Sequence, residues 1–268
     1  MSQQRPKPSV AVTGASKGIG YAIARAFAGA GYPIAVVDLD GAKAQDVATT
    51  LTDEFGVAAM GIFADVADSD SSRRAHEKIK ATLGSPGVLI NNAGIMQQKK
   101  GWIEELPEEN FDRMLDVHVR GALVWSRLVL PAMRADGFGR IINMSSVNAV
   151  LAVPHRLAYV TAKKAILGFT EGLALDCARA GITVNAILPG YILTDTLAQR
   201  AQQGLLNKED YNERTPVGRW GEPEEIARVA VFLADPASSF ITGAKFVIDG
   251  GLTIRGDAGE DIEASPYA

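Results

Sequence analysis

Short apolar runs alternate with longer amphipathic stretches along almost the whole chain. Ser9–Val12, Ile34–Val37 and Val88–Ile90 are runs in which nearly every residue is apolar, as expected of strands that are buried on both faces. Between the first two runs, apolar residues recur three or four positions apart from Ile19 to Ala30, which predicts a helix with one buried face. Strands and helices in alternation predict an α/β fold. We expect a doubly wound, Rossmann-type, mainly parallel sheet of seven strands with helices on both faces.

The same pattern predicts the other elements of this fold. Further strands are expected around Val57–Phe63, Arg140–Met144, Ile182–Leu188 and Ala244–Ile248. Further helices are expected at 44–55, after an N-cap at Ser69, from Pro107 to about Arg134, through Lys163 to Leu173, and from Glu222 to Leu233. The stretch from Tyr191 to Thr215 is irregular with short helical pieces, which is typical of a mobile lid over a substrate site.

No linker or internal repeat interrupts this order, so residues 1–268 are expected to form a single domain. Its first half, about 9–145, contains a glycine-rich turn and is expected to bind a cofactor. Its second half, about 146–254, is expected to hold the catalytic and substrate-binding residues. The tail, 255–268, is acidic and glycine-bearing and is expected to be a solvated end, with contact to a neighbouring subunit as the alternative.

Composition narrows the class of protein. With 268 residues and 47% hydrophobic residues, the chain can bury a substantial core. A net charge of −4 argues against nucleic acid as the main partner. The polar N-terminus lacks the apolar centre of a signal peptide, and no apolar run is long enough to cross a membrane, so we expect a cytoplasmic protein without a membrane partner. The single cysteine, Cys177, is expected to pack as a small apolar side chain.

A glycine-rich turn, Thr13-Gly-Ala-Ser-Lys-Gly-Ile-Gly20, joins the first strand to the first helix. Glycines let a backbone approach a pyrophosphate, and a helix N-terminus supplies N–H donors and positive potential. Asp38 ends the second strand at the offset expected for an acid that binds a ribose hydroxyl, and Asp65 follows the third, where it could accept from the amine of adenine. Ordinary β–α turns and a plain turn role for Asp38 remain the alternatives.

The chemistry is expected near Ser146, Tyr159 and Lys163. Tyr159 and Lys163 are four residues apart, so they share one face of the predicted helix. An ammonium beside a phenol favours the phenolate and lowers the pKa of the tyrosine. The hydroxyl of Ser146 could hold a substrate oxygen next to that phenol. Together these groups could move a proton on or off an alcohol or carbonyl oxygen.

These separate segments converge on one edge of the predicted sheet. Gly14, Asp38, Asn92, Ser146 and Pro189 all follow predicted strands. In an open α/β sheet, ligands bind at the carboxyl ends of the strands. The sequence therefore predicts one ligand site to which most strands contribute.

In this order and spacing the motifs resemble those of the short-chain dehydrogenase/reductase family, over about residues 10–253. They are Thr13-Gly14-x-x-x-Gly18-x-Gly20, Asn91-Asn92-Ala93-Gly94, Ser146, Tyr159-x-x-x-Lys163 and Pro189-Gly190. The resemblance implies hydride transfer between a nicotinamide cofactor and an alcohol/carbonyl pair. It also implies a homotetramer or homodimer, with helices near 107–134 and 155–179 at an interface. No metal is expected.

The resemblance further implies a role for each matching residue. Tyr159 is the expected general acid/base, Ser146 holds the substrate oxygen, and Lys163 holds the nicotinamide ribose and lowers the pKa of the tyrosine. Cofactor contacts are expected from Gly14, Ser16, Lys17, Gly18, Ile19, Gly20, Asp38, Asp65, Val66, Asn92, Ala93, Gly94, Tyr159, Lys163, Pro189, Gly190, Ile192 and Thr194.

His118 stands where the family has a fourth catalytic residue, an asparagine. In the family that position is proposed to hold a water through its main-chain carbonyl, in a proton relay with the lysine. This requires a locally opened helix rather than an asparagine side chain. We therefore expect an active enzyme in which His118 bonds nearby backbone and holds the opening, helped by Gly121. A purely structural, packed His118 is the alternative.

The sequence also gives expectations about the class of substrate and about whether the cofactor is NAD or NADP. Asp38 should repel a 2′-phosphate and favour NAD, although Lys17 in the turn could meet that phosphate and allow NADP. His155, Arg156 and Tyr191 are expected to border the substrate, and an arginine suits a hydroxyl-rich or anionic one. We expect a small polar, cyclic, sugar or polyol alcohol. A 3-oxoacyl thioester reductase and a non-catalytic dinucleotide sensor are the alternatives.

Overall fold

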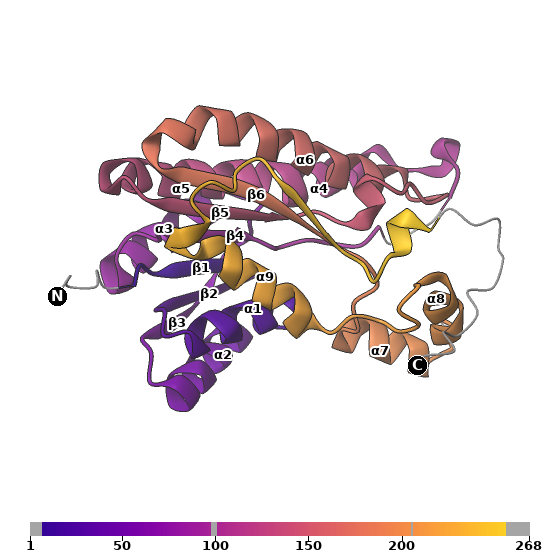
Figure 1. Cartoon of the computed structure of the whole chain (residues 1–268), viewed down its shortest axis with the longest axis horizontal. Coiled ribbons are helices and arrows are strands. Elements are labelled where there is room, and N and C mark those ends of the chain that lie inside the picture. Colours follow the sequence, from indigo (N-terminus) through magenta and orange to yellow (C-terminus); the bar gives the residue numbers. More distant parts are fainter. Residues whose placement is uncertain (1–6, 98–100, 205, 256–268) are drawn as a thin grey trace.

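The computed structural model describes residues 7–97, 101–204 and 206–255, and within these ranges seven parallel strands form one sheet (Figure 1). The strands run in the order β3-β2-β1-β4-β5-β6-β7. Their bounds are Val10–Thr13 for β1, Ile34–Asp38 for β2, Ala59–Phe63 for β3, Val88–Asn91 for β4, Gly139–Met144 for β5, Ile182–Pro189 for β6 and Lys245–Ile248 for β7. The predicted seven-stranded, doubly wound sheet is confirmed.

Helices cover both faces of this sheet (Figure 1). One face carries α1 (Gly18–Gly29), α2 (Gly41–Phe55) and α9 (Pro223–Ala234), and the other carries α3 (Ser69–Leu83), α5 (Gly121–Asp136) and α6 (Leu157–Cys177). Successive strand residues point to opposite faces. Val10 and Val12 accordingly join one core and Ala11 the other. This is why the strands are apolar throughout.

The strand order reverses between β1 and β4, which are neighbours in the sheet. The connection after β1 leads to α1 on one face, and the connection after β4 leads to the helices of the other face. A crevice therefore opens at the carboxyl ends of these two strands, the usual ligand position in such sheets. The glycine-rich turn and the Asn91–Gly94 segment both lie there.

The long helix expected from Pro107 to Arg134 is interrupted. It consists of α4 (Glu108–Leu115), a π turn (Asp116–Arg120) and α5. The N–H of Gly121 donates to the carbonyl of Asp116, five residues earlier, as in a π turn. Such turns are rare and are often found at functional sites. The local opening of the helix that we expected around His118 is present.

The predicted N-cap of α3 is wrong by one residue. Ser69 is the first residue of the helix, and the carboxylate of Asp68 accepts from the N–H groups of Asp70 and Ser71. An aspartate satisfies the free N–H donors at a helix start as well as a serine does. The sequence alone therefore could not decide whether Asp68 or Ser69 is the N-cap. Cys177 is buried, as expected.

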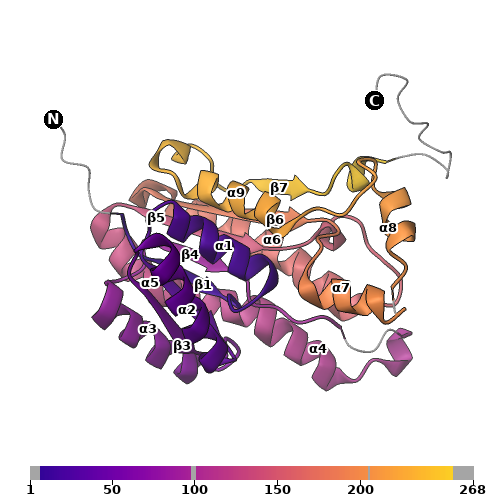
Figure 2. The ribbon, with the colours of Figure 1, turned by 90° about the horizontal axis from the view of Figure 1, so that it is seen from below.

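The irregular stretch after β6 contains α7 (Asp195–Gln202) and α8 (Lys208–Arg214). Figure 2 shows the two helices together at one end of the molecule, away from α2 and α3. The predicted acidic tail lies outside the described residues, apart from Arg255. Among the described helices, none combines the length and apolar character needed to cross a membrane.

Candidate active site

The turn between β1 and α1 has the shape of a phosphate cradle. Gly14 and Gly18 have φ values of 64° and 56°, which side chains rarely tolerate. A Cβ on Gly20 would lie 2.2 Å from the carbonyl oxygen of Gly14. Lys17, the N-cap of α1, makes no side-chain capping bond, so it leaves the first N–H groups of the helix uncovered. A pyrophosphate therefore fits against this turn.

Asp38 is tied to the same turn from the end of β2. One carboxylate oxygen accepts from the N–H of Ser16 at 3.0 Å, and the other accepts from the N–H of Asp40 at 3.1 Å. These bonds give the acid the turn-bracing role that we kept as an alternative. They also fix a negative charge beside the cradle, where we expected the ribose.

Asp65 lies at the same edge, next to Asp38. Phe63 is the register partner of Asp38, and the N–H of Ala64 donates to the carbonyl of Asp38 at 2.9 Å. Val66 follows and packs against the start of α5, because a Cβ on Gly121 would lie 3.1 Å from Val66. The structure thus brings together the two acids that we assigned to adenosine.

The segment after β4 is bonded to the glycine-rich turn. The amide nitrogen of Asn92 donates to the carbonyls of Thr13 and Gly14, both at 2.9 Å. In return, the hydroxyl of Thr13 accepts from the N–H groups of Asn92 and Ala93, both at 3.0 Å. The side chain of Asn92 therefore braces two strand ends. Gly94 is required for packing, because a Cβ there would lie 2.5 Å from Cε1 of His118.

Ser146, Tyr159 and Lys163 form one cluster at the ends of β5 and α6. The Nζ of Lys163 lies over the ring of Tyr159, 5.6 Å from its centroid, and donates to the carbonyl of Met144 at 2.9 Å. The main-chain carbonyl of Lys163 accepts from the hydroxyl of Ser145 at 2.8 Å. Tyr159 is hydrogen-bonded to Ser146. The spacing in the sequence thus predicted a true spatial cluster.

Burial dominates the pKa values in this cluster. Burial raises the pKa of Tyr159, against the opposing effects of its hydrogen bond to Ser146 and of the charge of Arg156. Burial also lowers the pKa of Lys163 to about 7. Ser146 and Arg156 oppose this effect of burial on the phenol. Lys163 is suited to exchanging a proton near neutral pH.

His118 lies in the π turn and faces Tyr159. Its Nε2 is 2.9 Å from the carbonyl oxygen of Ile95 and 3.2 Å from the Ile95 nitrogen, so the shorter contact favours donation to the carbonyl. We expected the imidazole to bond nearby backbone. The backbone that it bonds is the loop after β4, because the ring reaches across to Gly94 and Ile95.

The buried imidazole of His118 is held neutral. Burial and the charge of Lys163 lower its pKa to about 3, and the hydrogen bond to Ile95 opposes them. An imidazole with this pKa is uncharged at neutral pH. Repulsion between an imidazolium at His118 and the ammonium of Lys163 is therefore avoided.

Sequence reasoning missed Gln97, which is buried beside the start of α6. Its side-chain amide donates to the carbonyl of His155 at 3.1 Å and accepts from the N–H of Tyr159 at 3.4 Å. Its own carbonyl accepts from Arg156 at 3.0 Å. The only available signal was its position three residues after the Asn91–Gly94 motif. Arg156 thus supports this loop, in addition to facing Tyr159.

His155 and Tyr191 occupy two loops at this edge of the sheet. His155 has a φ of 61°, rare for a residue with a side chain, and its ring meets Trp102 edge to face, with centroids 4.6 Å apart. Tyr191 packs against Tyr211 of α8 at 4.5 Å, and both contact Trp220. The aromatic cluster joins α8 to the chain just after β6. Trp102 is a second residue that the sequence pattern did not reveal.

The chain after β6 returns to the glycine-rich turn. A Cβ on Gly190 would lie 2.7 Å from the Cα of Asp249, so Pro189 and Gly190 end β6 against the end of β7. Ile192 is buried. Thr194 then reaches the cradle, because a Cβ on Gly18 would lie 3.3 Å from its Cγ2. Among the described residues, no group of His, Cys, Asp and Glu could hold a metal ion.

Comparison with known proteins identifies relatives along nearly the whole chain. Residues 14–253 match the sequence model of a family described as enoyl-(acyl carrier protein) reductase. Short-chain dehydrogenase fogB of Aspergillus ruber is 37% identical over 91% of this chain and 96% of its own length. An NAD-dependent glycerol dehydrogenase of Listeria innocua is 35% identical over 91% of this chain and 93% of its own length.

A solved structure agrees with this similarity. The gluconate 5-dehydrogenase of Burkholderia cenocepacia, in complex with NADP and tartrate, superposes with a TM-score of 0.86 at 33% identity. The similarity covers 94% of this chain and 97% of that one. The likeness therefore extends over the cradle, the cluster of Ser146, Tyr159 and Lys163, and the stretch after β6 together.

Proposed function

Because this chain belongs to the short-chain dehydrogenase/reductase family, we propose that it is an NAD-dependent dehydrogenase of a small hydroxyl-rich alcohol, acting through Tyr159. That it is a nicotinamide-dependent oxidoreductase follows from the family. The observation that supports the rest is the meeting of two parts at one edge of the sheet. Asn92 ties the end of β4 to the cradle that contains Asp38. On the other side of β4, the amide of Asn91 donates to Asn143 of β5, the strand that leads into the cluster of Ser146, Tyr159 and Lys163.

Each residue of the cluster has one task in this mechanism. The hydroxyl of Ser146 holds the substrate oxygen beside the phenol of Tyr159. In the reductive direction Tyr159, which burial keeps protonated at neutral pH, donates its proton to the carbonyl oxygen. In the oxidative direction it takes the proton of the alcohol. Lys163, with a pKa of about 7, exchanges that proton onward. A bound nicotinamide supplies or accepts the hydride.

The proposed substrate class rests on two supports. Two of the relatives are named for glycerol and gluconate, which are both rich in hydroxyls. The loop just before Tyr159 carries His155, packed on Trp102 and held by Gln97. An imidazole with an indole combines polar donors with an apolar surface, which suits a polyol or sugar.

A 3-oxoacyl thioester reductase is the second candidate, since the matching family model is described as an acyl carrier protein reductase. A panel of polyols and sugar acids with NAD, followed by absorbance of NADH, should be compared with reduction of an acetoacetyl thioester. Faster turnover of a polyol supports the proposal. Turnover of the thioester alone replaces it with the second candidate, and no turnover of either kind favours a non-catalytic dinucleotide sensor.

The preference for NAD follows from charge at the ribose position. Asp38 and Asp40 lie beside the cradle, and the residue between them, Leu39, is uncharged and exposed. A 2′-phosphate would meet this negative charge, and only the flexible Lys17 would oppose it. The gluconate 5-dehydrogenase structure contains NADP, whereas the glycerol dehydrogenase is named as NAD-dependent, so relatives of this chain use either form.

Catalytic efficiency with the two cofactors tests this preference. Wild type should favour NAD, and Asp38→Asn should shift the ratio toward NADP by about tenfold, the effect of ~1.4 kcal/mol of removed repulsion. Asp46→Asn, on the exposed face of α2, is the matched control and should leave the ratio unchanged. A wild-type preference for NADP contradicts the proposal.

We also propose that the protein is a homodimer or homotetramer. Leu123 on α5 and Leu175 on α6 are 43% and 83% exposed, and both lie in the helices expected at an interface. Light scattering after gel filtration tests this, and a monomer at all concentrations would contradict it.

A further inference from the structure

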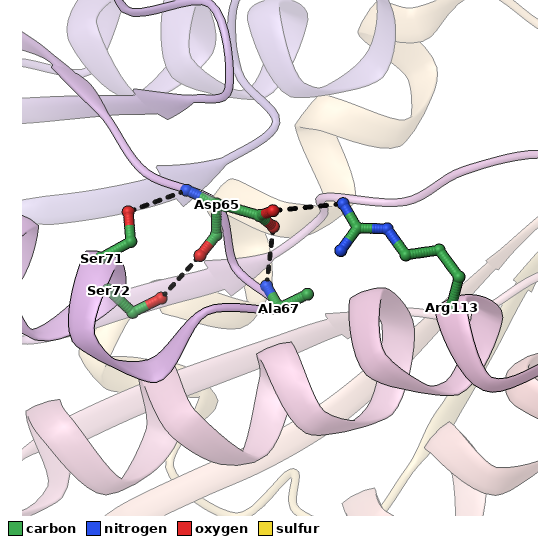
Figure 3. Close-up of polar contacts among 5 residues, drawn as sticks. All are labelled: Asp65, Ala67, Ser71, Ser72 and Arg113. Atoms are coloured by element: carbon green, nitrogen blue, oxygen red, sulfur yellow. Dashed lines mark hydrogen bonds and ion pairs between the residues drawn. The ribbon is translucent and has the colours of Figure 1, made fainter. Parts of the chain in front are cut away.

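Asp65 is held by hydrogen bonds at each polar atom of its backbone and side chain (Figure 3). Its N–H donates to the hydroxyl of Ser71 at 3.1 Å, and its carbonyl accepts from the hydroxyl of Ser72 at 3.4 Å. Its Oδ1 accepts from the N–H of Ala67 at 2.9 Å. The remaining atom, Oδ2, accepts from Nη2 of Arg113 at 3.2 Å. One conformation of the carboxylate is therefore selected.

Arg113 belongs to a different part of the fold from the other partners. It lies in the last turn of α4, 48 residues from Asp65 along the chain, whereas the other three partners lie within seven residues. The side chains of Arg113 and Asp65 are 46% and 28% exposed. A half-exposed pair of this kind contributes little to folding stability. Its effect is instead on the orientation of the carboxylate.

The next helix, α5, also touches this corner of the sheet. Val66, next to Asp65, packs against Gly121 at the start of α5. Contacts to this corner therefore come from α4, before the π turn that carries His118, and from α5, after it. Without Arg113, Oδ2 of Asp65 would lose its hydrogen bond to α4. The hydrogen bond from Ala67 to Oδ1 and the packing of Val66 against Gly121 would remain.

The two oxygens of Asp65 keep further accepting capacity, because each carboxylate oxygen has two lone pairs and only one donor here. Asp65 lies beside Asp38 at the carboxyl edge of the sheet. With the ribose at Asp38, the base extends toward Asp65, and an exocyclic amine would meet an acceptor of fixed direction. A carbonyl in place of the amine would meet a negative charge.

We propose that Arg113 is a positioning residue for recognition of the adenine amine, because it fixes the carboxylate of Asp65 in the accepting orientation. This inference rests on the proposed function, which supplies the adenine dinucleotide. Arg113 acts through Asp65 and does not itself need to touch the base. Its loss should weaken selection for the amine while leaving the rest of the cofactor site intact.

The test compares NAD with nicotinamide hypoxanthine dinucleotide, which has a carbonyl where adenine has the amine. Dissociation constants for both are measured by calorimetry on wild type, Arg113→Met and Arg113→Lys. Wild type should prefer NAD. Arg113→Met should lower this preference by about threefold to tenfold, the range of one hydrogen bond of ordinary net strength. Binding of the hypoxanthine form should hardly change, and Arg113→Lys should keep part of the preference because it keeps the charge.

Arg127→Met, an exposed arginine on α5, is the matched control and should leave both constants unchanged. An unchanged preference in Arg113→Met, or an equal loss of affinity for both dinucleotides, would overturn the inference, since the pair would then be a surface or purely structural contact. If wild type bound neither dinucleotide, the proposed function itself would fail, a distinct result from an unchanged preference.

Discussion

The imidazole of His118 meets the ring of Tyr159 edge to face, with 5.8 Å between centroids and 85° between planes. The same imidazole contacts the main chain of Ile95 at 2.9 Å. His118 therefore joins the π turn, the loop after β4 and the start of α6. A residue that differs from the family's asparagine thus still occupies a position at the centre of the site.

Replacements of His118 should show whether activity depends on its hydrogen bond to Ile95 or only on the space that its side chain fills. His118→Asn should retain activity within about tenfold, because an amide can still donate to the carbonyl of Ile95. His118→Leu should lose more, because leucine leaves that carbonyl without its donor. His76→Leu is a control, since His76 is also buried but lies on α3. The measurement is kcat/KM with the best alcohol.

Two results would contradict this role of His118. Equal activity of the asparagine and leucine variants would show that its hydrogen bond does not matter. Collapse of the asparagine variant alone would show that the imidazole takes part in chemistry beyond holding the loop.

Acid should destabilise the fold through His118. Its pKa in the folded state, about 3, lies below the ordinary value of 6.5. Between these values the unfolded chain binds a proton that the folded chain does not, so the free energy of unfolding falls as pH falls from 6.5 toward 3. His118→Asn should reduce this slope by up to about 1.4 kcal/mol per pH unit. Urea unfolding of both proteins at several pH values measures it, and parallel slopes would contradict the prediction.

The arrangement of the sheet could be predicted from the sequence because it depends on local patterns. Strands buried on both faces must be apolar throughout. The turn after β1 must have glycine at position 20, because a Cβ there would lie 2.2 Å from the carbonyl oxygen of Gly14. The opening of the helix at His118 could also be predicted, because the proton relay proposed for the family that this sequence resembles requires a free main-chain carbonyl there.

Contacts between distant segments could not be predicted in this way. Gln97 bonds His155 across 58 residues, His118 bonds Ile95 across 23, and Arg113 bonds Asp65 across 48. Each is a polar side chain whose partner is decided by how the helices pack. The raised pKa of Tyr159 has the same origin, since burial at the site outweighs the nearest charges.

Arg156 should influence the pH dependence of the reaction. Its charge lowers the pKa of Tyr159, so Arg156→Met should raise that pKa. Oxidation of the alcohol needs the deprotonated phenol, so the rise of kcat/KM with pH should move to higher pH in this variant. Arg156→Lys should keep the wild-type profile more closely because it keeps the charge.

A profile that does not move in Arg156→Met, or that moves to lower pH, would contradict this prediction. A change in KM alone, at an unchanged pH profile, would instead return Arg156 to the substrate-binding role expected from the sequence.

Replacement of Tyr159 by phenylalanine tests the central claim most directly. The variant loses the phenol oxygen but keeps the ring that meets His118 and lies under Lys163. Calorimetry should show NADH binding close to wild type, while kcat with the best alcohol should fall by ~10²–10⁴, the usual contribution of a general acid or base. Retained NADH binding with a loss of kcat smaller than about tenfold would contradict Tyr159 as the proton donor and acceptor.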